Sequence, residues 1–388
     1  MIYLDYAATT PLSEKAGEVF THVASQYYGN ASSLHDVGSS AKQILEASAK
    51  AIAKVMNADG KDVYFTSGAS ESNFLAIQAL LDGCKKKGKH LITTKIEHAS
   101  VKDVFEKLEA EGFEVTWLDT NEKGEILIEE LKSSVREDTL LVSIQHANSE
   151  IGTIQNIKEI GAFLKEEDVL LHTDAVQTFG KIHIDVAELN IDALSISAHK
   201  IYGPKGVGAV WINPETEWVP FFEDHTQTRK LKTGTDNVPG AAAFATAAKE
   251  IIANMAAETR RLKGLRVSFL SLLDELEHTV VVEGNAPNQL PNIIGLRYPG
   301  MEGQFLMLEC NQAGLAISTG SACQVGSEEP NRTMKALGRS DEEAREFVRI
   351  SLGQFVKEDH LKEIIDKIDT ILTRHFRKVH QNQLPSNA

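Results

Sequence analysis

Short apolar runs alternate with helical patterns along the first two thirds of the chain. Seven of these runs have the length and the β-branched content of strands, and turn-forming residues lie at their ends. The predicted strands are 63–66, 90–94, 114–118, 139–144, 169–172, 194–197 and 208–212. Helical periodicity separates several of them, at 69–86, 100–111, 128–135 and 157–165. This alternation predicts a mostly parallel sheet covered by helices on both faces, a three-layer α/β/α fold.

The pattern changes after about residue 239. A long alanine-rich helical segment is followed by two short strands, a further helix, a small-residue loop, another strand and helices up to the C-terminus. This order predicts a smaller α+β domain beside the large one. The expected parts are a large α/β domain at 14–255, a smaller domain formed by 1–13 and 256–380, and a polar tail at 381–388.

Composition and charge narrow the class of protein. The 388 residues are 42% hydrophobic and 24% charged, which is ordinary for a globular protein with a sizeable core. A net charge of −15 argues against general binding to nucleic acid or to anionic membranes. The chain shows no apolar run of membrane-spanning length and no basic leader, and its three scattered cysteines suit neither a disulfide framework nor a metal site. We therefore expect a cytoplasmic protein with reduced thiols and no metal.

Ligands of such sheets bind beyond the carboxyl ends of the strands, so the polar residues there are candidates for a site. Lys200 follows the predicted strand 194–197 and precedes a turn rich in glycine and proline. Poor solvation biases a lysine amine toward its neutral, nucleophilic form, which suits a Schiff base with a carbonyl compound such as pyridoxal phosphate. The alternative is a solvated lysine beside a β-turn.

Other strand ends carry groups that suit the same cofactor. Ala69 and Ser70 begin a helix, and the free N–H groups at a helix N-terminus favour a phosphate, although an ordinary N-cap explains the same residues. Asp174 follows a buried strand and needs a cation, which a pyridinium nitrogen supplies, unless it only caps a helix. His98 either lies over an aromatic ring or caps the next helix. Together these groups predict a pyridoxal-phosphate enzyme.

Two further residues suggest a substrate. Cys323 lies among small polar residues, unlike Cys310 in its apolar helix, which favours a thiol presented on a loop over an incidental cysteine. Arg349 is the one charged residue of the predicted strand at 347–353. Its guanidinium either binds a substrate carboxylate or forms an internal salt bridge.

These motifs resemble those of the NifS/IscS-type cysteine desulfurases, in the class V aminotransferase group of fold-type I pyridoxal-phosphate enzymes. The most specific matches are Ser-Ala-His-Lys-Ile-Tyr-Gly-Pro-Lys-Gly at 197–206 and Ser-Thr-Gly-Ser-Ala-Cys at 318–323. The resemblance covers nearly the whole chain. It implies a homodimer that converts L-cysteine to L-alanine and transfers the sulfur to Cys323 as a persulfide, for iron–sulfur cluster assembly or another sulfur-transfer pathway.

The resemblance also implies roles for the matching residues. Lys200 is the Schiff-base lysine and proton carrier, His98 stacks on the ring and takes part in acid–base steps, and Arg349 binds the cysteine carboxylate. Asp174 pairs with the pyridine nitrogen and Gln177 with the phenolic oxygen. The implied phosphate contacts are Ala69, Ser70, Ser197, His199 and, from the neighbouring subunit, Thr235.

One departure from the family pattern concerns the cofactor contacts. The family usually has a second asparagine where this chain has Ser149, so either Ser149 replaces the amide contact to the phenolic oxygen or Asn148 shifts to make it. The sulfur acceptor stays open between an iron–sulfur scaffold and a dedicated iron–sulfur enzyme. An aminotransferase or a selenocysteine lyase on the same fold, and a non-catalytic scaffold, are the alternatives. Cys323 argues against transamination, which needs no thiol, and the intact Lys200 and Asp174 argue against a scaffold.

Overall fold

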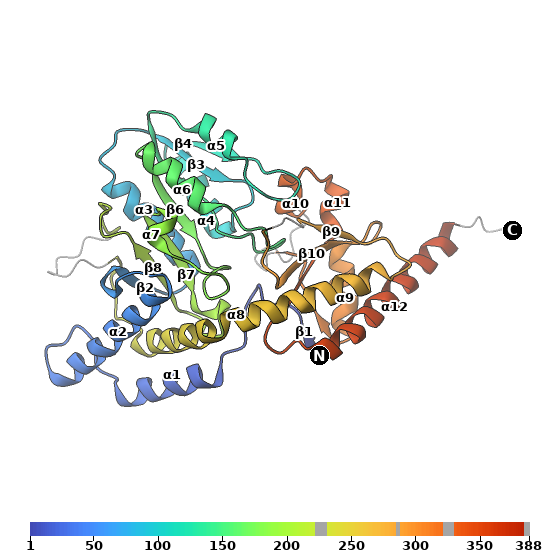
Figure 1. Cartoon of the computed structure of the whole chain (residues 1–388), viewed down its shortest axis with the longest axis horizontal. Helices are drawn as coiled ribbons and strands as arrows, with labels where there is room; N and C mark the ends of the chain where they lie inside the picture. Colours follow the sequence, from blue (N-terminus) through green and yellow to red (C-terminus); the bar gives the residue numbers. More distant parts are fainter. Residues whose placement is uncertain (222–230, 285–287, 321–329, 384–388) are drawn as a thin grey trace.

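The computed structural model describes residues 1–221, 231–284, 288–320 and 330–383, with side chains described up to residue 377. Cys323 therefore lies outside the described residues. The molecule has a larger and a smaller part, each with its own β-structure, and the helix α8 (Val238–Asp274) runs along both of them, as Figure 1 shows. Asn237 caps the N-terminus of this helix, because its side-chain oxygen accepts a hydrogen bond from the backbone N–H of Gly240 at 3.0 Å.

The larger part is built on a seven-stranded sheet. Its strands, in spatial order, are β2 (Val63–Thr66), β8 (Gly208–Ile212), β7 (Ala193–Ser197), β6 (Leu170–Asp174), β5 (Thr139–Ser143), β3 (His90–Thr94) and β4 (Glu114–Leu118). β8 runs antiparallel to both of its neighbours, and the other adjacent pairs are parallel. The carboxyl ends of six strands and the beginning of β8 therefore lie at one edge of the sheet.

Alternating side chains of these strands build a core on each face of the sheet. Leu91 packs into the core of one face and the adjacent Ile92 into that of the other, as the twofold repeat of a strand requires. The helices of the first face are α3 (Ala69–Gly83) and α4 (Ala99–Ala110). Those of the second face are α2 (Asp36–Val55), α6 (Ile157–Glu166), α7 (Val186–Leu189) and part of α8. The predicted three-layer α/β/α fold is confirmed.

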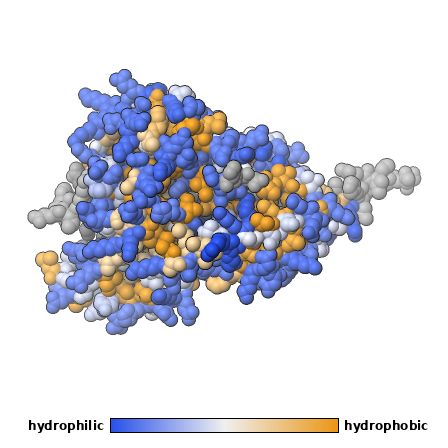
Figure 2. Space-filling model, viewed as in Figure 1, coloured by the Kyte–Doolittle hydropathy of each residue, from blue (hydrophilic) through white to orange (hydrophobic). Residues whose placement is uncertain are grey.

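Two helices extend the larger part, and one covers its edge. α1 (Glu14–Gln26) and α2 pack against the first half of α8, where small buried side chains such as Ala241 and Ala248 let the helices approach closely. α5 (Ile128–Ser134) lies against the edge strand β4. Hydrophilic residues cover most of the face drawn in Figure 2, with apolar side chains interspersed.

The smaller part has the predicted α+β composition. Its antiparallel sheet contains β12 (Phe347–Ser351), β10 (Ile293–Arg297) and β9 (Val281–Glu283) in that order. A second, two-stranded sheet pairs β1 (Ile2–Tyr3) with β11 (Leu315–Ala316), so the N-terminus joins this part of the molecule. The helices are α9 (Gly303–Gln312), α10 (Arg332–Ala336), α11 (Asp341–Arg345) and α12 (Glu358–Gln383).

The predicted boundary at residue 255 falls inside α8, which continues without a break to Asp274. The helix α12 runs to Gln383, so residues 381–383 of the predicted polar tail are helical, and 384–388 lie outside the described residues. Within the described ranges, no helix is both long and apolar enough to cross a membrane, and no group of three His, Cys, Asp or Glu side chains is arranged to hold a metal ion.

Candidate active site

Lys200 ends the short 3-10 turn Ala198–Lys200, which follows β7 at the carboxyl edge of the large sheet. Its Nζ donates hydrogen bonds to the backbone oxygens of Ala7 (2.6 Å) and Ala8 (2.8 Å). The N-terminal segment is tied to the same turn because Thr10 donates its backbone N–H to the His199 oxygen at 2.9 Å. The N-terminal residues of the chain thus position the amine across the strand ends.

Asp174 is the last residue of β6 and is only 7% exposed. Its Oδ2 accepts a hydrogen bond from Asn73 Nδ2 (2.9 Å) and its Oδ1 accepts one from the backbone N–H of Val176 (2.9 Å). No lysine, arginine or histidine forms an ion pair with this carboxylate in the described part of the chain. A buried carboxylate held by neutral donors alone suits a cation brought by a ligand, such as a pyridinium nitrogen.

His98 caps the N-terminus of α4, as one of the two sequence interpretations expected. Its Nδ1 accepts the backbone N–H of Ser100 at 3.2 Å and lies 2.8 Å from the Ser100 hydroxyl. An accepting Nδ1 places the proton of the neutral ring on Nε2. Burial lowers the pKa of His98, the charge of Lys200 acts in the same direction, and Asp174 opposes them. A neutral imidazole that carries its proton on Nε2 is therefore the expected form.

Asn73 connects these groups. Its Nδ2 donates both to Asp174 and to the Ser100 hydroxyl, the latter at 2.9 Å. Asp174, Asn73, Ser100 and His98 thus form one continuous hydrogen-bonded chain. Asn73 was not among the predicted site residues, although it is a polar side chain on the inner, otherwise apolar face of α3.

The start of α3 lies close to the beginning of β8, which pairs with the end of β7. The N-cap of α3 is Gly68, with φ +154° and no side-chain hydrogen bond, so neither Ser67 nor Ser70 caps the helix. A Cβ on Gly208 would come within 2.8 Å of the Gly68 backbone, so a side chain there would displace the helix start. The hydroxyl of Ser197 is buried without a partner. The positive end of α3 and this orphaned hydroxyl fit a phosphate group.

The other predicted phosphate residues differ in exposure and in their contacts. Ala69 is half-buried and Ser70 is exposed. His199 lies 3.2 Å from the Thr9 hydroxyl through its Nδ1, and burial lowers its pKa to about 4, helped by Lys200. Thr235 is exposed in the segment that precedes α8.

Gln177 lies on the turn after β6 and is buried. Its Nε2 donates to the Ala7 oxygen at 3.0 Å, the same carbonyl that accepts from Lys200.

Asn148 and Ser149 form hydrogen bonds with other parts of the protein. The Asn148 amide oxygen accepts from the backbone of Glu150 (2.8 Å) and Ile151 (3.0 Å), and its Nδ2 donates to the Ile96 oxygen, so this side chain closes its own turn.

Arg349 lies in the middle of β12 and is 2% exposed. It forms the internal salt bridge that the sequence left open, with Nη2 2.6 Å from Asp5 Oδ1, and Nη1 donates to the Ser149 oxygen at 3.0 Å. Its Nε is buried without a partner. The guanidinium is thus held in place by two contacts and keeps one donor for a further carboxylate.

The segment that leads to Cys323 begins beside this arginine. Ser318 and Arg349 exchange backbone hydrogen bonds, with Ser318 N to Arg349 O at 3.1 Å and the reverse at 2.6 Å.

Asp5 and the carbonyls of Ala7 and Ala8 were not predicted as site residues. The available signal was the charge of Asp5 directly after the apolar residues 2–4.

Glu97 is a further buried group that the sequence analysis did not assign. Its Oε1 accepts from the Thr94 hydroxyl and from the backbone N–H of Gln145, both at 2.9 Å, whereas Oε2 is buried without a partner. Burial raises the pKa of Glu97 to about 8, and the negative charge of Asp174 adds to the effect, although both hydrogen bonds oppose it. Glu97 therefore keeps its proton at neutral pH.

This shift predicts a pH dependence of stability. The folded protein holds the Glu97 proton up to about pH 8, whereas the unfolded chain loses it near the ordinary pKa of glutamate. The contribution of Glu97 to the free energy of unfolding is therefore fully present below the ordinary glutamate pKa and is lost as the pH rises toward 8. Between pH 5 and pH 8 the free energy of unfolding of the wild type should fall by a few kcal/mol more than that of Glu97→Gln, which cannot ionise. Parallel slopes of melting temperature against pH for both proteins would contradict this assignment. The exposed Glu109→Gln serves as the control.

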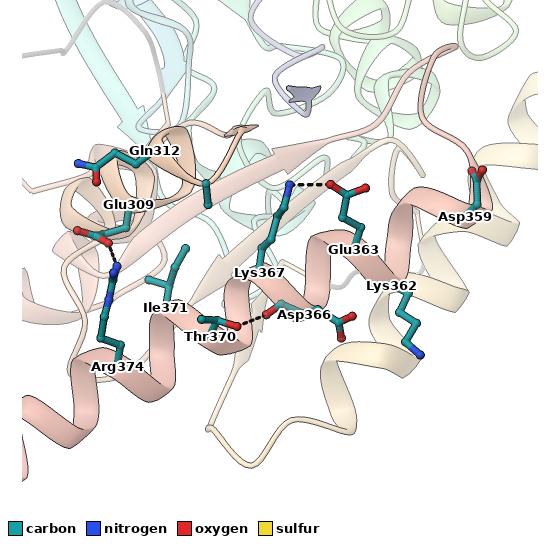
Figure 3. A pocket seen from close by; sticks show the side chains of 11 residues that line it. Glu309, Gln312, Asp359, Lys362, Glu363, Asp366, Lys367, Thr370, Ile371 and Arg374 are labelled. Atoms are coloured by element: carbon teal, nitrogen blue, oxygen red, sulfur yellow. Dashed lines mark hydrogen bonds and ion pairs between the residues drawn. The ribbon is translucent and has the colours of Figure 1, made fainter.

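A groove of about 670 Å³ between α9 and α12 lies apart from these residues. Four of its charged side chains form ion pairs, Lys367 with Glu363 at 2.6 Å and Arg374 with Glu309, as Figure 3 shows. None of the predicted site residues lines it. The chemistry is therefore expected at the strand ends, not at this groove.

The groups at the strand ends fit one cofactor. They comprise an amine at a strand end, a buried carboxylate without a cation, and a helix N-terminus with an orphaned hydroxyl beside it. Pyridoxal phosphate carries a carbonyl, a pyridinium nitrogen and a phosphate, which these groups match in kind. The fold and the site define a pyridoxal-phosphate-dependent enzyme of fold type I.

Comparison with known proteins agrees with this class. The aminotransferase class-V family matches residues 2–364. The putative cysteine desulfurase NifS of Bacillus subtilis is 47% identical over 367 residues, which cover 94% of this chain and 93% of the relative. The cysteine desulfurase IscS of Dictyoglomus turgidum is 39% identical over 373 residues, 96% and 95% of the two chains. The chain belongs to the NifS/IscS cysteine desulfurase family.

Solved structures show the same relationship. A structure described as a NifS-like protein superimposes with a TM-score of 0.89 at 31% identity, covering 96% of this chain and 99% of the other. A structure described as SspA in complex with cysteine has a TM-score of 0.80 at 33% identity, covering 91% and 99% of the two chains.

Proposed function

We propose that this protein is a cysteine desulfurase, which converts L-cysteine to L-alanine and transfers the sulfur to Cys323 as a persulfide. The observation that carries the proposal is the N-terminal segment, whose residues connect the amine and the guanidinium. Ala7 and Ala8 bind Lys200, and Asp5 binds Arg349. A relative named cysteine desulfurase and a neighbour solved with cysteine support the choice of substrate.

The cofactor would be held by residues of the larger part of the chain. Lys200 would attach it covalently, Asp174 would pair with its ring nitrogen and Gln177 with its phenolic oxygen. The phosphate would be bound by Ala69, Ser70, Ser197, His199 and, from a second subunit, Thr235, while Asn148 and Ser149 would line the site. When bound, the cofactor supplies an electron-withdrawing ring that stabilises negative charge on the α-carbon of the substrate.

The side chains of this protein perform the remaining steps. Arg349 binds the α-carboxylate of cysteine through its unpartnered Nε, and Lys200 Nζ removes the α-proton. The Cys323 thiolate attacks the substrate sulfur, so an S–S bond forms and the carbon–sulfur bond breaks. The bonding electrons stay on the β-carbon, which takes up one proton, and the α-carbon regains a proton from Lys200 to give alanine. His98, protonated on Nε2, is the proposed proton donor.

The assembly and the pathway extend this proposal. The exposure of Thr235 supports a homodimer in which it reaches the phosphate of the neighbouring subunit. Residues 14–255 would carry the cofactor, and 1–13 with 256–380 the cysteine segment. The free thiols of Cys84 and Cys310 support a cytoplasmic location. A sulfur-acceptor protein, either an iron–sulfur scaffold or a dedicated iron–sulfur enzyme, would then discharge Cys323.

The direct test uses the purified protein loaded with pyridoxal phosphate. L-Cysteine should yield alanine, and a thiol reductant should release an equal amount of sulfide. Transfer of the amino group to a keto acid, with no alanine formed from cysteine, would contradict the proposal and favour an aminotransferase.

A prediction follows from the Asp5–Arg349 ion pair. Asp5→Asn keeps an oxygen at the position that accepts from Arg349 but removes the negative charge that competes with the substrate carboxylate. We expect the KM for L-cysteine to fall about fivefold, with kcat nearly unchanged. Steady-state kinetics of alanine formation measure this effect, with the exposed Glu109→Gln as the charge-matched control. A KM that rises or stays constant would show that Asp5 does not compete with substrate.

A further inference from the structure

A second lysine, Lys181, lies near Lys200 and has no part in the proposed reaction. The turn after β6 carries Asp174, Gln177 and Lys181 in succession. Backbone hydrogen bonds from Phe179 to Ala175 and from Lys181 to Thr178 shape this turn. Gln177 and Lys181 are four residues apart, so their side chains can meet on one side of it.

Lys181 belongs to a hydrogen-bonded chain that ends at Lys200. Lys181 Nζ donates to Gln177 Oε1 at 3.3 Å, Gln177 Nε2 donates to the Ala7 oxygen at 3.0 Å, and Lys200 Nζ donates to the same oxygen at 2.6 Å. In its protonated form the Lys181 amine only donates, so it then determines which end of the Gln177 amide is the oxygen. The Nε2 end is thereby directed toward Ala7 and Lys200, with one N–H still available.

The surroundings of Lys181 make this an unusual place for a lysine. Although its stem is half-buried, burial of the amine, together with the charge of Lys200, lowers the pKa of Lys181 to about 7. The charge of Lys181 also contributes to the lowered pKa of His199. From α8, the neutral hydroxyl of Thr259 donates to the backbone oxygen of Lys181 and not to its amine. No carboxylate pairs with Lys181 among the described residues, and its amine donates to Gln177. Burying a lysine amine without a carboxylate partner costs free energy, and the hydrogen bond to Gln177 is the interaction that offsets this cost here.

We infer that Lys181 is a positioning residue, which holds the Gln177 amide so that its N–H, and not its carbonyl, faces the phenolic oxygen of the cofactor. This inference rests on the proposed function, in which Gln177 binds that oxygen. The phenolic oxygen and the Lys200 nitrogen would share one proton. A hydrogen-bond donor at the oxygen makes the oxygen less basic, so the shared proton is released at lower pH. Without Lys181 the amide can turn over, and the donor is lost.

The test is a pH titration of the visible absorption of the cofactor-loaded protein. Lys181→Met should raise the midpoint by about one pH unit, because the phenolic oxygen loses its donor. Lys181→Arg, which keeps a donor, should restore the midpoint toward the wild-type value. The exposed Lys205→Met, which removes an equal charge from the turn after Lys200, should leave the midpoint unchanged.

A double-mutant cycle tests whether Lys181 acts through Gln177. Gln177→Leu alone should raise the midpoint, and adding Lys181→Met should raise it no further. If Lys181→Met does not fold, Lys181→Gln, a neutral and weaker donor, should give a smaller shift in the same direction. An unchanged midpoint in the substituted protein, or additive shifts in the double variant, would overturn the inference.

Failure of this inference can be told apart from failure of the proposed function. A wild-type protein that binds no pyridoxal phosphate, or forms no alanine from cysteine, would overturn the proposed function itself. A wild-type protein that does both, with a Lys181→Met variant that titrates as the wild type does, would overturn only the role of Lys181.

Discussion

Lys200→Ala is expected to lower the rate of alanine formation from L-cysteine by about a thousandfold or more, because one amine both attaches the cofactor and transfers the α-proton. The substitution also removes the Lys200 hydrogen bonds to the carbonyls of Ala7 and Ala8, although Ala7 still accepts from Gln177. The measurements are kcat for alanine formation and the visible absorption of the protein after borohydride reduction and dialysis. The wild type should retain the reduced cofactor and the variant should lose it.

The exposed Lys205, on the turn that follows Lys200, provides the matched control. Lys205→Ala should keep both the activity and the borohydride-fixed cofactor. A Lys200→Ala protein that still retains the reduced cofactor covalently would show that another amine forms the attachment, and Lys181 would be the first to examine because of its depressed pKa.

Cys323→Ser is expected to reduce alanine formation by about a hundredfold to a thousandfold, since a hydroxyl does not attack a substrate sulfur as a thiolate does. Binding of cysteine should persist, because Lys200 and Arg349 are untouched, so the visible spectrum should still change when cysteine is added. This loss of turnover with retained binding is the signature of a missing sulfur acceptor.

The other cysteines serve as controls for this variant. Burial raises the pKa of Cys310 to about 12, so its thiol stays protonated at neutral pH and is a poor nucleophile. Cys84 is half-buried on the far end of α3. Cys84→Ser should therefore turn over cysteine at the wild-type rate, and full activity in Cys323→Ser would remove the thiol step from the proposed reaction.

The sequence predicted the sheet and its helices well because short apolar runs and helical periodicity are local signals. The strands at 63–66, 90–94 and 114–118 have the expected bounds. The two-residue strands β1 and β11 were not predicted, since each is too short for a pattern and forms only by pairing with the other. The antiparallel direction of β8 is likewise fixed by its neighbours and not by its composition.

The site was predicted as far as side-chain chemistry at strand ends could take it. Lys200, Asp174 and Gln177 do lie at one edge of the sheet, as expected from their places in the chain. The contacts of the N-terminal segment were not predictable, because Ala7 offers only a backbone oxygen and lies 193 residues from Lys200. For Arg349, composition could not decide between a salt bridge and a substrate, and the structure shows the salt bridge together with a spare donor.

Asn148 illustrates a different limit. Its amide was a candidate for the phenolic oxygen, yet most of its hydrogen bonds close the turn 148–151. An asparagine in a polar turn can serve its own backbone or a ligand, and the sequence of the turn is the same in both cases. Its contact with the cofactor, and that of Ser149, therefore stay predictions.

The most direct test of the central claim is mass spectrometry of the cofactor-loaded protein after one turnover of L-cysteine without reductant. The account predicts one alanine per subunit and the mass of one added sulfur atom on the peptide that contains Cys323, removable by a thiol reductant. Alanine formed with that peptide unmodified, or with the sulfur on Cys84 or Cys310, would contradict it.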